Sequence, residues 1–295
     1  MQKSENKIAL IGGDQRQLFV AECFADKGYC VSVWGCDTYG IDSRIHTNES
    51  LSEAIEGADT IILPLPTSKD GMYLNCPGSV ERVTFEEITE RVKRSQNIVA
   101  GNVSPEMLLI CSKKGLKIYD CMDSERFKIL NAIPTAEGAV EIAMRELPFT
   151  VHGSKSLVVG FGRIGKALSK LLKAMDSDVY VSARKEADRA MAEMYGYVSL
   201  KPEEICKAAG DADVIFNTAP FKMLNKPIIS NIRKGTPIID LASLPGGVDM
   251  ISAEECGIKV IHALSLPGKV APKTAGRIMA DCITDMLYAN GVRTL

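Results

Sequence analysis

The sequence lacks an apolar run long enough to cross a membrane, and it lacks a surplus of positive charge. No stretch of roughly 18 or more uncharged apolar residues occurs, so no transmembrane helix is expected. Lys and Arg number 35 against 37 Asp and Glu, which argues against nucleic acid as a partner because phosphate binding needs a basic surface. The first apolar run stops at paired glycines, so the amino terminus predicts a strand and not a signal peptide.

Paired cysteines and clustered histidines are also absent. The nine cysteines are scattered without a Cys-x-x-Cys pair, which favours free thiols in a reducing cytoplasm over disulfides or a zinc site. The three histidines are His46, His152 and His262, and no metal-binding spacing joins them. We therefore expect no metal centre.

Alternating strands and helices fill the chain. Its 295 residues, 46% of them hydrophobic, suffice for two domains with separate cores. The predicted strands are residues 7–11, 30–34, 60–63, 97–100 and 117–119 in the first half, and 156–159, 178–181, 214–217, 237–241 and 259–262 in the second. Helical stretches separate them, which is typical of βαβ units. We predict an α/β protein with two Rossmann-like, doubly wound parallel-sheet domains and a cleft between them.

Two helices are expected where the chain passes between the domains. One covers residues 135–146, and the other covers 272–288 with Pro272 in its first turn. The last helix is expected to return to the first domain. The predicted division is therefore 1–131, completed by 272–295, for a substrate-binding domain, and 132–271 for a dinucleotide-binding domain.

A glycine-rich turn, GFGRIG at residues 160–165, lies between a predicted strand and a predicted helix. This context and spacing indicate a dinucleotide-binding turn. The first glycine permits the turn, the second lets backbone N–H groups approach a pyrophosphate, and the third lets the helix pack on the strand. The residues of this turn predicted to bind the cofactor are Gly160, Gly162, Arg163, Ile164 and Gly165.

The end of the next strand favours NADP over NAD. An acidic residue there accepts hydrogen bonds from the ribose hydroxyls of NAD, but this chain has Ala183 at that position. Ser182, Arg184 and Lys185 surround it and suit a 2′-phosphate. A solvated basic turn is the alternative.

Two further strand ends in the second half carry small residues suited to the nicotinamide side of the cofactor. The residues predicted to bind there are Thr218, Ala219 and Pro220 after one strand, and Ala242 and Ser243 after the next. Plain strand-to-helix turns are the alternative.

Anion-binding residues are predicted at two other places. Gly12 and Gly13 end the first strand, and Arg16 follows them where α/β sheets bind ligands. Lys269, Lys273 and Thr274 precede or open the last helix, whose N-terminus favours an anion. Pairing of Arg16 with a surface acid is the alternative for that residue.

With these residues in view, the chain resembles the A subunits of dipicolinate synthase from spore-forming bacteria, over essentially its whole length. The shared stretches are 11–17 (IGGDQRQ), 133–138 (IPTAEG), 152–154 (HGS), 160–163 (GFGR), 182–184 (SAR), 217–218 (NT), 240–243 (DLAS), 245–247 (PGG), 266–268 (LPG) and 270–276 (VAPKTAG). The general plan is also similar to that of 2-hydroxyacid and alanine dehydrogenases. His262 departs from the family pattern, and we expect it to be a buried structural residue.

The resemblance implies oxidation of dihydrodipicolinate, or of its hydroxylated tetrahydropyridine precursor, to dipicolinate during sporulation, in the mother-cell cytoplasm. A flavoprotein-like B subunit is the implied partner, and a homo-oligomer is expected. Loss of a hydride and a proton makes the ring aromatic, so NADP⁺ is a natural acceptor. Arg16 and Lys269 or Lys273 would hold the two carboxylates, and Glu137 and His152 are the candidate proton carriers.

Two other functions stay open. One is a different NADP-dependent dehydrogenase that acts on a 2-hydroxy acid or an amino acid. The other is a non-catalytic NADP-binding subunit, because the sequence presents no histidine–carboxylate pair beside its nucleotide motif.

Overall fold

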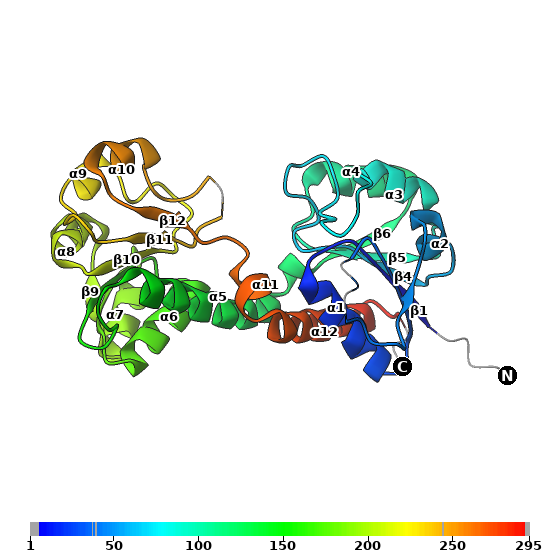
Figure 1. Cartoon of the computed structure of the whole chain (residues 1–295), viewed down its shortest axis with the longest axis horizontal. Coiled ribbons are helices and arrows are strands. Elements are labelled where there is room, and N and C mark those ends of the chain that lie inside the picture. The colour runs from blue at the N-terminus through cyan, green and yellow to red at the C-terminus, as the bar shows by residue number, and fades with distance from the viewer. Residues whose placement is uncertain (1–5, 37, 39, 244, 293–295) are drawn as a thin grey trace. The chain divides into compact units, whose positions relative to one another are not determined.

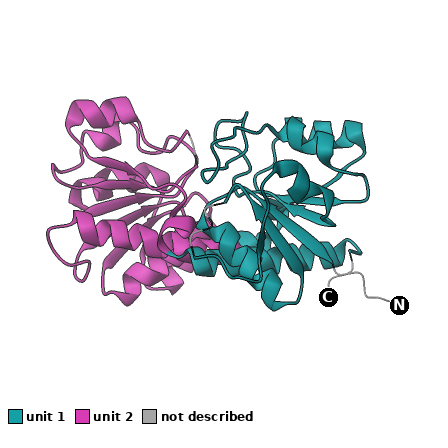
Figure 2. Ribbon diagram, turned by 45° about the vertical axis from the view of Figure 1, so that its right-hand side comes forward, with its two compact units in different colours: residues 1–128, 271–295 teal, residues 129–270 magenta. Residues whose placement is uncertain are grey.

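The computed structural model describes residues 6–36, 38, 40–243 and 245–292 (Figure 1). These residues form two compact units, and the chain passes between them after Lys128 and again after Val270 (Figure 2). Unit 1 comprises the described residues up to Lys128 and from Ala271 onward, and unit 2 comprises residues 129–270.

The sheet of unit 1 is parallel and six-stranded, in the order β3-β2-β1-β4-β5-β6. Its strands are β1 (Lys7–Ile11), β2 (Cys30–Trp34), β3 (His46–Thr47), β4 (Thr60–Ile62), β5 (Asn97–Ala100) and β6 (Lys117–Asp120). The strand order reverses between β1 and β4. Such a switch point opens a crevice at the carboxyl ends of the strands, where ligands of α/β sheets bind.

Both faces of this sheet are buried, because alternate residues of each strand point to opposite sides. Ile8 and Leu10 pack against α1 (Gln15–Asp26) and α12 (Pro272–Ala289), whereas Ala9 and Ile11 face the other layer. That layer contains α2 (Leu51–Glu56), α3 (Phe85–Arg91) and α4 (Pro105–Lys114), and the short helix η1 (Cys121–Asp123) follows β6. The C-terminal helix α12 thus packs in the core of unit 1.

The sheet of unit 2 has the same topology, in the order β12-β11-β10-β7-β8-β9, and it is also parallel. Its strands are β7 (Lys155–Val159), β8 (Asp178–Ser182), β9 (Val198–Leu200), β10 (Val214–Asn217), β11 (Ile238–Asp240) and β12 (Val260–His262). Here the order reverses between β7 and β10. The switch point therefore lies directly beside the glycine-rich turn that follows β7.

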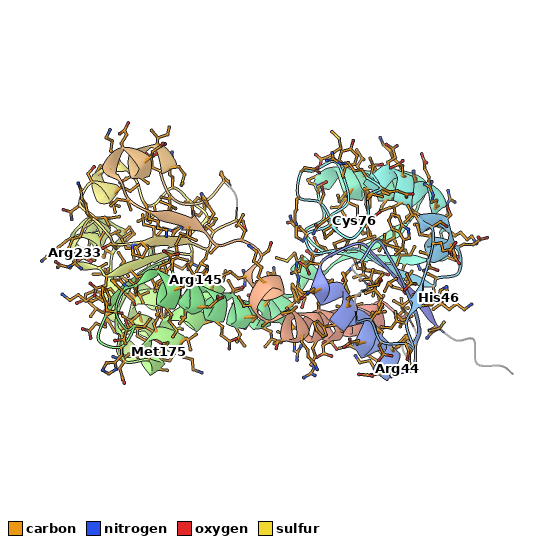
Figure 3. The ribbon with its side chains drawn as sticks, viewed as in Figure 1. Arg44, His46, Cys76, Arg145, Met175 and Arg233 are labelled. Atoms are coloured by element: carbon orange, nitrogen blue, oxygen red, sulfur yellow. The ribbon has the colours of Figure 1, made fainter. Side chains whose placement is uncertain are left out.

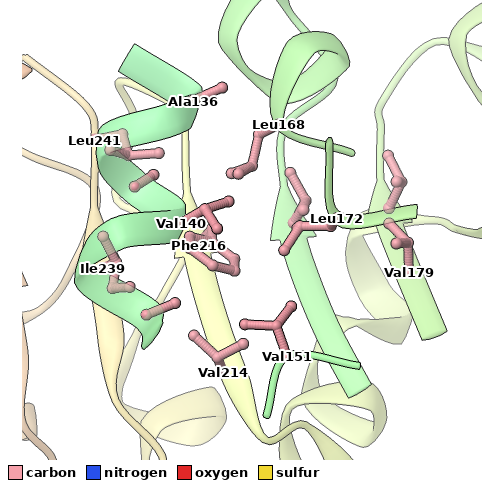
Figure 4. Packing of buried hydrophobic residues seen from close by; sticks show 14 of the residues in the cluster. Ala136, Val140, Val151, Leu168, Leu172, Val179, Val214, Phe216, Ile239 and Leu241 are labelled. Carbon is pink, nitrogen blue, oxygen red and sulfur yellow. The ribbon is translucent and has the colours of Figure 1, made fainter. Parts of the chain in front are cut away.

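Two helical layers enclose this sheet as well. On one face, Phe216 and Ile239 pack beneath Val140 and Leu168 from two helices (Figure 4). On the other face, Ile215 and the other alternate strand residues pack against shorter helices. The helices of unit 2 are α6 (Arg163–Ala174), α7 (Glu186–Met194), η2 (Pro202–Glu204), α8 (Ile205–Asp211), α9 (Lys226–Ile229), α10 (Met250–Cys256) and α11 (Leu266–Val270).

One helix, α5 (Glu125–Glu146), carries the chain from unit 1 into unit 2. The sequence predicts a helix over 135–146, but α5 begins ahead of this range and contains Pro134 in its interior. A proline in a sequence suggests a helix start, because its missing N–H is harmless in a first turn. In α5, however, the residues before Pro134 are already helical. The helix begins after Ser124, whose hydroxyl accepts the Phe127 N–H at 3.2 Å, and it continues past the proline.

The predicted fold class, two Rossmann-like doubly wound parallel-sheet domains, is confirmed by these topologies. The strands β3 and β9 were not predicted, because these two short edge strands carry no recognisable β-branched run. No helix in the described part of the chain has the length and apolarity needed to span a membrane.

Candidate functional site

The turn between β7 and α6 brings strand, loop and helix into close contact. Gly160 has a φ of +101°, a left-handed value that favours glycine, and its N–H donates to the Ser182 carbonyl at 2.9 Å. A Cβ on Gly165 would lie 2.2 Å from the Gly160 carbonyl oxygen. Both glycines are therefore required by the backbone itself.

Gly162 differs from these two glycines. Its φ is −79°, which any residue adopts, and a Cβ at this position would meet nothing within 4 Å. It is the N-cap residue of α6, and among the described residues no side chain caps that helix end. The fold does not need a glycine here, so the space left open at the N–H groups of α6 fits the close approach of an anionic group such as a pyrophosphate.

A cavity of about 230 Å³ opens beside this turn. The predicted cofactor residues that line it are Gly160, Gly162, Ser182, Arg184, Lys185, Thr218, Ala219 and Pro220. Thr218 fixes one wall, since its hydroxyl donates to the carbonyls of Val159 at 3.1 Å and Gly160 at 3.2 Å. Five other predicted cofactor residues do not line the cavity. Three of them, Arg163, Ile164 and Gly165, lie in the first turn of α6, and the other two, Ala242 and Ser243, follow β11.

The end of the cavity beside β8 is cationic. Ala183 is buried, and the exposed Arg184 and Lys185 follow it. The Arg184 guanidinium lies 5.1 Å from the centroid of the Phe221 ring, a cation–π distance. Asp188 is the one carboxylate among the described lining residues, and Lys166 Nζ lies 3.3 Å from it. Phe221 and Asp188 were not predicted from the sequence, because neither belongs to a recognisable motif.

A buried network holds the loops that follow β10 and β11. Asp240 is fully buried, and its Oδ1 accepts from the Asn217 amide at 2.7 Å and from the Ala242 N–H at 3.2 Å. Its Oδ2 accepts from the Gly247 N–H at 3.1 Å. The Asn217 amide also donates to the Ala219 carbonyl at 3.1 Å. One carboxylate thereby connects the cavity wall to the loop after β11.

His262 lies next to this network. It ends the edge strand β12, in register with Asp240 on β11, and its Nδ1 is 3.7 Å from Asp240 Oδ2. The sequence predicts a buried histidine here, which is wrong: 35% of the side chain is exposed, because β12 is the edge strand of the sheet that the described residues form. A histidine–carboxylate pair therefore exists that was not predicted from the sequence.

In unit 1, Arg16 already has a carboxylate partner. Its Nε and Nη2 donate to the two oxygens of Asp14 at 2.8 Å each, and Nη2 also donates to the Leu65 carbonyl at 2.5 Å. Burial opposes ionisation of Asp14, but the hydrogen bonds and charge of Arg16, with the charge of Lys69, leave the pKa of this carboxyl below its usual value. A substrate carboxylate would have to share this guanidinium with Asp14.

Other side chains at the same end of this sheet are polar and buried. Gln17 is 2% exposed, and neither the oxygen nor the nitrogen of its side-chain amide has a hydrogen-bond partner among the described residues. The Cys36 thiol donates to the Gly12 carbonyl at 3.0 Å, and burial raises its pKa to about 12. This thiol is therefore protonated and unreactive at neutral pH.

The predicted anion-binding residues near the last helix divide between the units. Lys269 is exposed in the short helix α11 of unit 2, whereas Lys273 and Thr274 are exposed in the first turn of α12 in unit 1. From the sequence, residues 266–274 were expected to form a loop that leads into the last helix, but residues 266–270 are helical. Within the part of the chain that the structure describes, the N-terminus of α12 has no side-chain cap, and a helix N-terminus favours an anion.

Neither of the two candidate proton carriers, Glu137 and His152, lines the cavity. Glu137 is exposed on α5, and His152 precedes β7, with Nδ1 3.6 Å from Asp176 Oδ2. Because Gly160 follows β7, the whole strand separates His152 from the glycine-rich turn. Within the described residues, no three His, Cys, Asp or Glu side chains are grouped so as to hold a metal ion.

Comparison with known proteins places this geometry in a family. Residues 7–122 match the N-terminal domain of dipicolinate synthase A subunits, and residues 134–242 match the NAD-binding domain of D-isomer specific 2-hydroxyacid dehydrogenases. The A subunit of dipicolinate synthase from Bacillus subtilis (strain 168) is 33% identical over 285 residues, which cover 95% of each chain. The chain belongs to the family of dipicolinate synthase A subunits.

Solved structures of this family have the same fold. The A subunit from Bacillus halodurans superposes with a TM-score of 0.88 at 29% identity, over 96% of this chain and 98% of that one. Its counterpart from Bacillus subtilis gives a TM-score of 0.85 at 31% identity, over 97% of both chains. Unit 2 thus contains a nicotinamide dinucleotide-binding domain, and the chain is a dehydrogenase-type subunit.

Proposed function

We propose that this chain oxidises dihydrodipicolinate, or its hydroxylated tetrahydropyridine precursor, to dipicolinate with NADP⁺ as the hydride acceptor. The observation that carries the proposal is the cavity beside the glycine-rich turn in a chain of this family. The backbone conformation at residue 162 does not require a glycine, and a side chain there would enter open space. A glycine at this position therefore supports the close approach of a pyrophosphate.

The choice of NADP rests on the charges at the end of β8. A 2′-phosphate there would meet the hydroxyl of Ser182 and the cations of Arg184 and Lys185, which all line the cavity. A carboxylate that would select NAD is missing at Ala183, and the nearby Asp188 already has Lys166 as a partner. Arg184 would donate charge-assisted hydrogen bonds to the phosphate.

The remaining residues of this chain would bind and orient a dicarboxylate. Arg16, Lys269, Lys273 and Thr274 are the candidates for the two substrate carboxylates, and the Asp240 network would hold the loops at Ala219 and Ala242 against the nicotinamide half. Bound NADP⁺ supplies the hydride acceptor. Because aromatisation of the ring favours the reaction, positioning of the substrate is the main task of the protein.

We further propose that the chain works with a flavoprotein-like B subunit, in the cytoplasm of the mother cell of a sporulating bacterium. Membership in a family of A subunits supports a second chain. A bound partner would favour the productive conformation by a shift of populations.

Turnover of the purified chain tests this proposal. The chain is mixed with the product of dihydrodipicolinate synthase and NADP⁺, with and without the B subunit, and the dipicolinate and NADPH absorbance bands are followed. We expect slow or no product from the chain alone and a large gain with the partner. If neither mixture forms dipicolinate while NADP⁺ still binds, the chain has a non-catalytic role. Turnover with 2-hydroxy acids or amino acids instead would assign it to another dehydrogenase class.

A further inference from the structure

A cation and an aromatic ring meet at the cavity beside the glycine-rich turn. Arg184, which follows β8, and Phe221, which follows β10, both line this cavity. The central guanidinium carbon lies 5.1 Å from the centroid of the ring, within the range of a cation–π interaction. Because Phe221 is 55% exposed, its ring contributes little to the core of unit 2. Its contact with the cation is therefore the interaction that a role at the cavity would use.

Two other arginines of unit 2 direct their guanidinium groups to carboxylates instead. Arg233 donates to Asp213 at 2.8 Å. Arg145, on α5, donates to Glu141 at 3.5 Å, and Figure 3 labels both of these arginines. Within the described residues, the Arg184 guanidinium makes no such bond to an oxygen, and the ring is its neighbour. The ring holds the cation without an oxygen that would occupy the N–H donors, so these donors remain available to a phosphate.

The backbone on each side of this contact is held by hydrogen bonds. Arg189 of α7 donates to the Arg184 carbonyl at 2.8 Å, which fixes the turn after β8. On the other side, the fully buried Leu224 donates its N–H to the Gly247 carbonyl at 3.1 Å, which fixes the end of the loop that carries Phe221. Both loops are thus anchored, and the two side chains meet between them.

We propose that Phe221 is a positioning residue for the cofactor: its ring holds the Arg184 guanidinium for the 2′-phosphate, so that the preference for NADP over NAD depends on this ring. The inference rests on the proposed function and names a residue that sets its cofactor specificity. An exposed arginine side chain loses rotamer freedom when it binds a phosphate, and the ring limits that freedom before the phosphate arrives. NAD has no 2′-phosphate, so its affinity should not depend on this contact.

Calorimetric titration with NADP⁺ and with NAD⁺ tests the inference on two variants. Phe221→Leu keeps an apolar side chain but removes the ring, whereas Phe221→Trp keeps a ring that binds cations more strongly. We expect Phe221→Leu to weaken NADP⁺ binding roughly 3- to 30-fold and NAD⁺ binding by less than about twofold. The Phe221→Trp variant should retain the wild-type preference for NADP⁺.

Matched controls come from the same unit. Phe149 is 49% exposed, Arg145 is also exposed, and neither lines the cavity. Phe149→Leu and Arg145→Ala should therefore leave both affinities at the wild-type values. A double-mutant cycle then separates positioning from direct contact: in an Arg184→Ala background, Phe221→Leu should change the ratio of NADP⁺ to NAD⁺ affinity no further, because the ring acts through the guanidinium.

Three results would overturn the inference. An unchanged affinity ratio in Phe221→Leu would show that the ring does not set the preference. Equal losses of NADP⁺ and NAD⁺ affinity would show that the ring contacts a part that both cofactors share, such as the adenine. The same loss of NADP⁺ affinity with and without Arg184 would show that the ring acts independently of the guanidinium. Failure of the proposed cofactor choice is distinct, because the wild-type protein alone would then bind NAD⁺ at least as tightly as NADP⁺.

Discussion

The guanidinium of Arg16 and the carboxylate of Asp14 form a two-pronged ion pair at the start of α1, with both N–O distances at 2.8 Å. Asp14 also caps the helix, since it accepts the backbone N–H of Arg16 at 3.1 Å. The residue predicted to anchor a substrate carboxylate is therefore also a structural residue of unit 1. Its substitution will change stability as well as binding.

Arg16→Ala should lower the free energy of unfolding by about 1–3 kcal/mol, because it leaves a partly buried carboxylate without its partner. The same variant should weaken dipicolinate binding by roughly 2–5 kcal/mol if the guanidinium also meets the substrate. Lys273→Ala, at an exposed position, is the matched comparison: it should change stability by less than about 0.5 kcal/mol and still weaken binding. Urea unfolding and calorimetry measure the two effects. Unchanged dipicolinate affinity in both variants would remove these residues from the substrate site.

Asp14 should make stability depend on pH in the acid range. Because its pKa is lower in the folded chain than in the unfolded chain, its contribution is fully present above the unfolded value of about 3.9 and is lost as the pH falls through the folded pKa. As the pH falls below about 5, the free energy of unfolding of the Asp14→Asn variant should therefore decrease less than that of the wild type. Urea midpoints measured across this range check the prediction, and parallel pH curves for the two proteins would contradict it.

Cofactor preference should follow the turn after β8. NADP should bind more tightly than NAD, since loss of a charge-assisted phosphate contact costs on the order of 1.5–3 kcal/mol. The double variant Ala183→Asp with Arg184→Ala should reverse the preference, because it restores a ribose acceptor and removes a cation. Calorimetry with both cofactors is the measurement. Wild-type affinity for NAD equal to or above that for NADP would show that this turn is only a solvated basic loop.

Substitutions at Gly165 and at Gly162 should affect different properties, the first the stability of unit 2 and the second the affinity for NADP⁺. A methyl group at Gly165 would lie 2.2 Å from the Gly160 carbonyl, whereas one at Gly162 would meet open space. Gly165→Ala should destabilise unit 2 by about 1–3 kcal/mol, and Gly162→Ala should leave the unfolding midpoint unchanged but weaken NADP⁺ binding. Equal NADP⁺ affinity for Gly162→Ala and the wild type would mean that no pyrophosphate approaches this residue.

Local patterns in the sequence were sufficient for the strand–helix alternation and for the glycine-rich turn, because each depends on neighbouring residues. The core strands of both units and the cavity residues near Gly160 and Ser182 were predicted on that basis. Contacts that depend on how neighbouring strands are aligned could not be predicted from such local patterns. The pair of His262 and Asp240 exists because β11 and β12 align these residues. Likewise, Phe221 meets Arg184 only after two loops converge.

The ratio of NADPH to dipicolinate formed is the measurement that tests the central claim most directly. Both products are followed in the same reaction of this chain with its B subunit, NADP⁺ and dihydrodipicolinate. We predict one NADPH for each dipicolinate, and we predict that a Gly162→Asp variant, whose carboxylate would stand where the pyrophosphate approaches, forms neither product. Dipicolinate without matching NADPH, or full activity in the Gly162→Asp variant, would contradict the account.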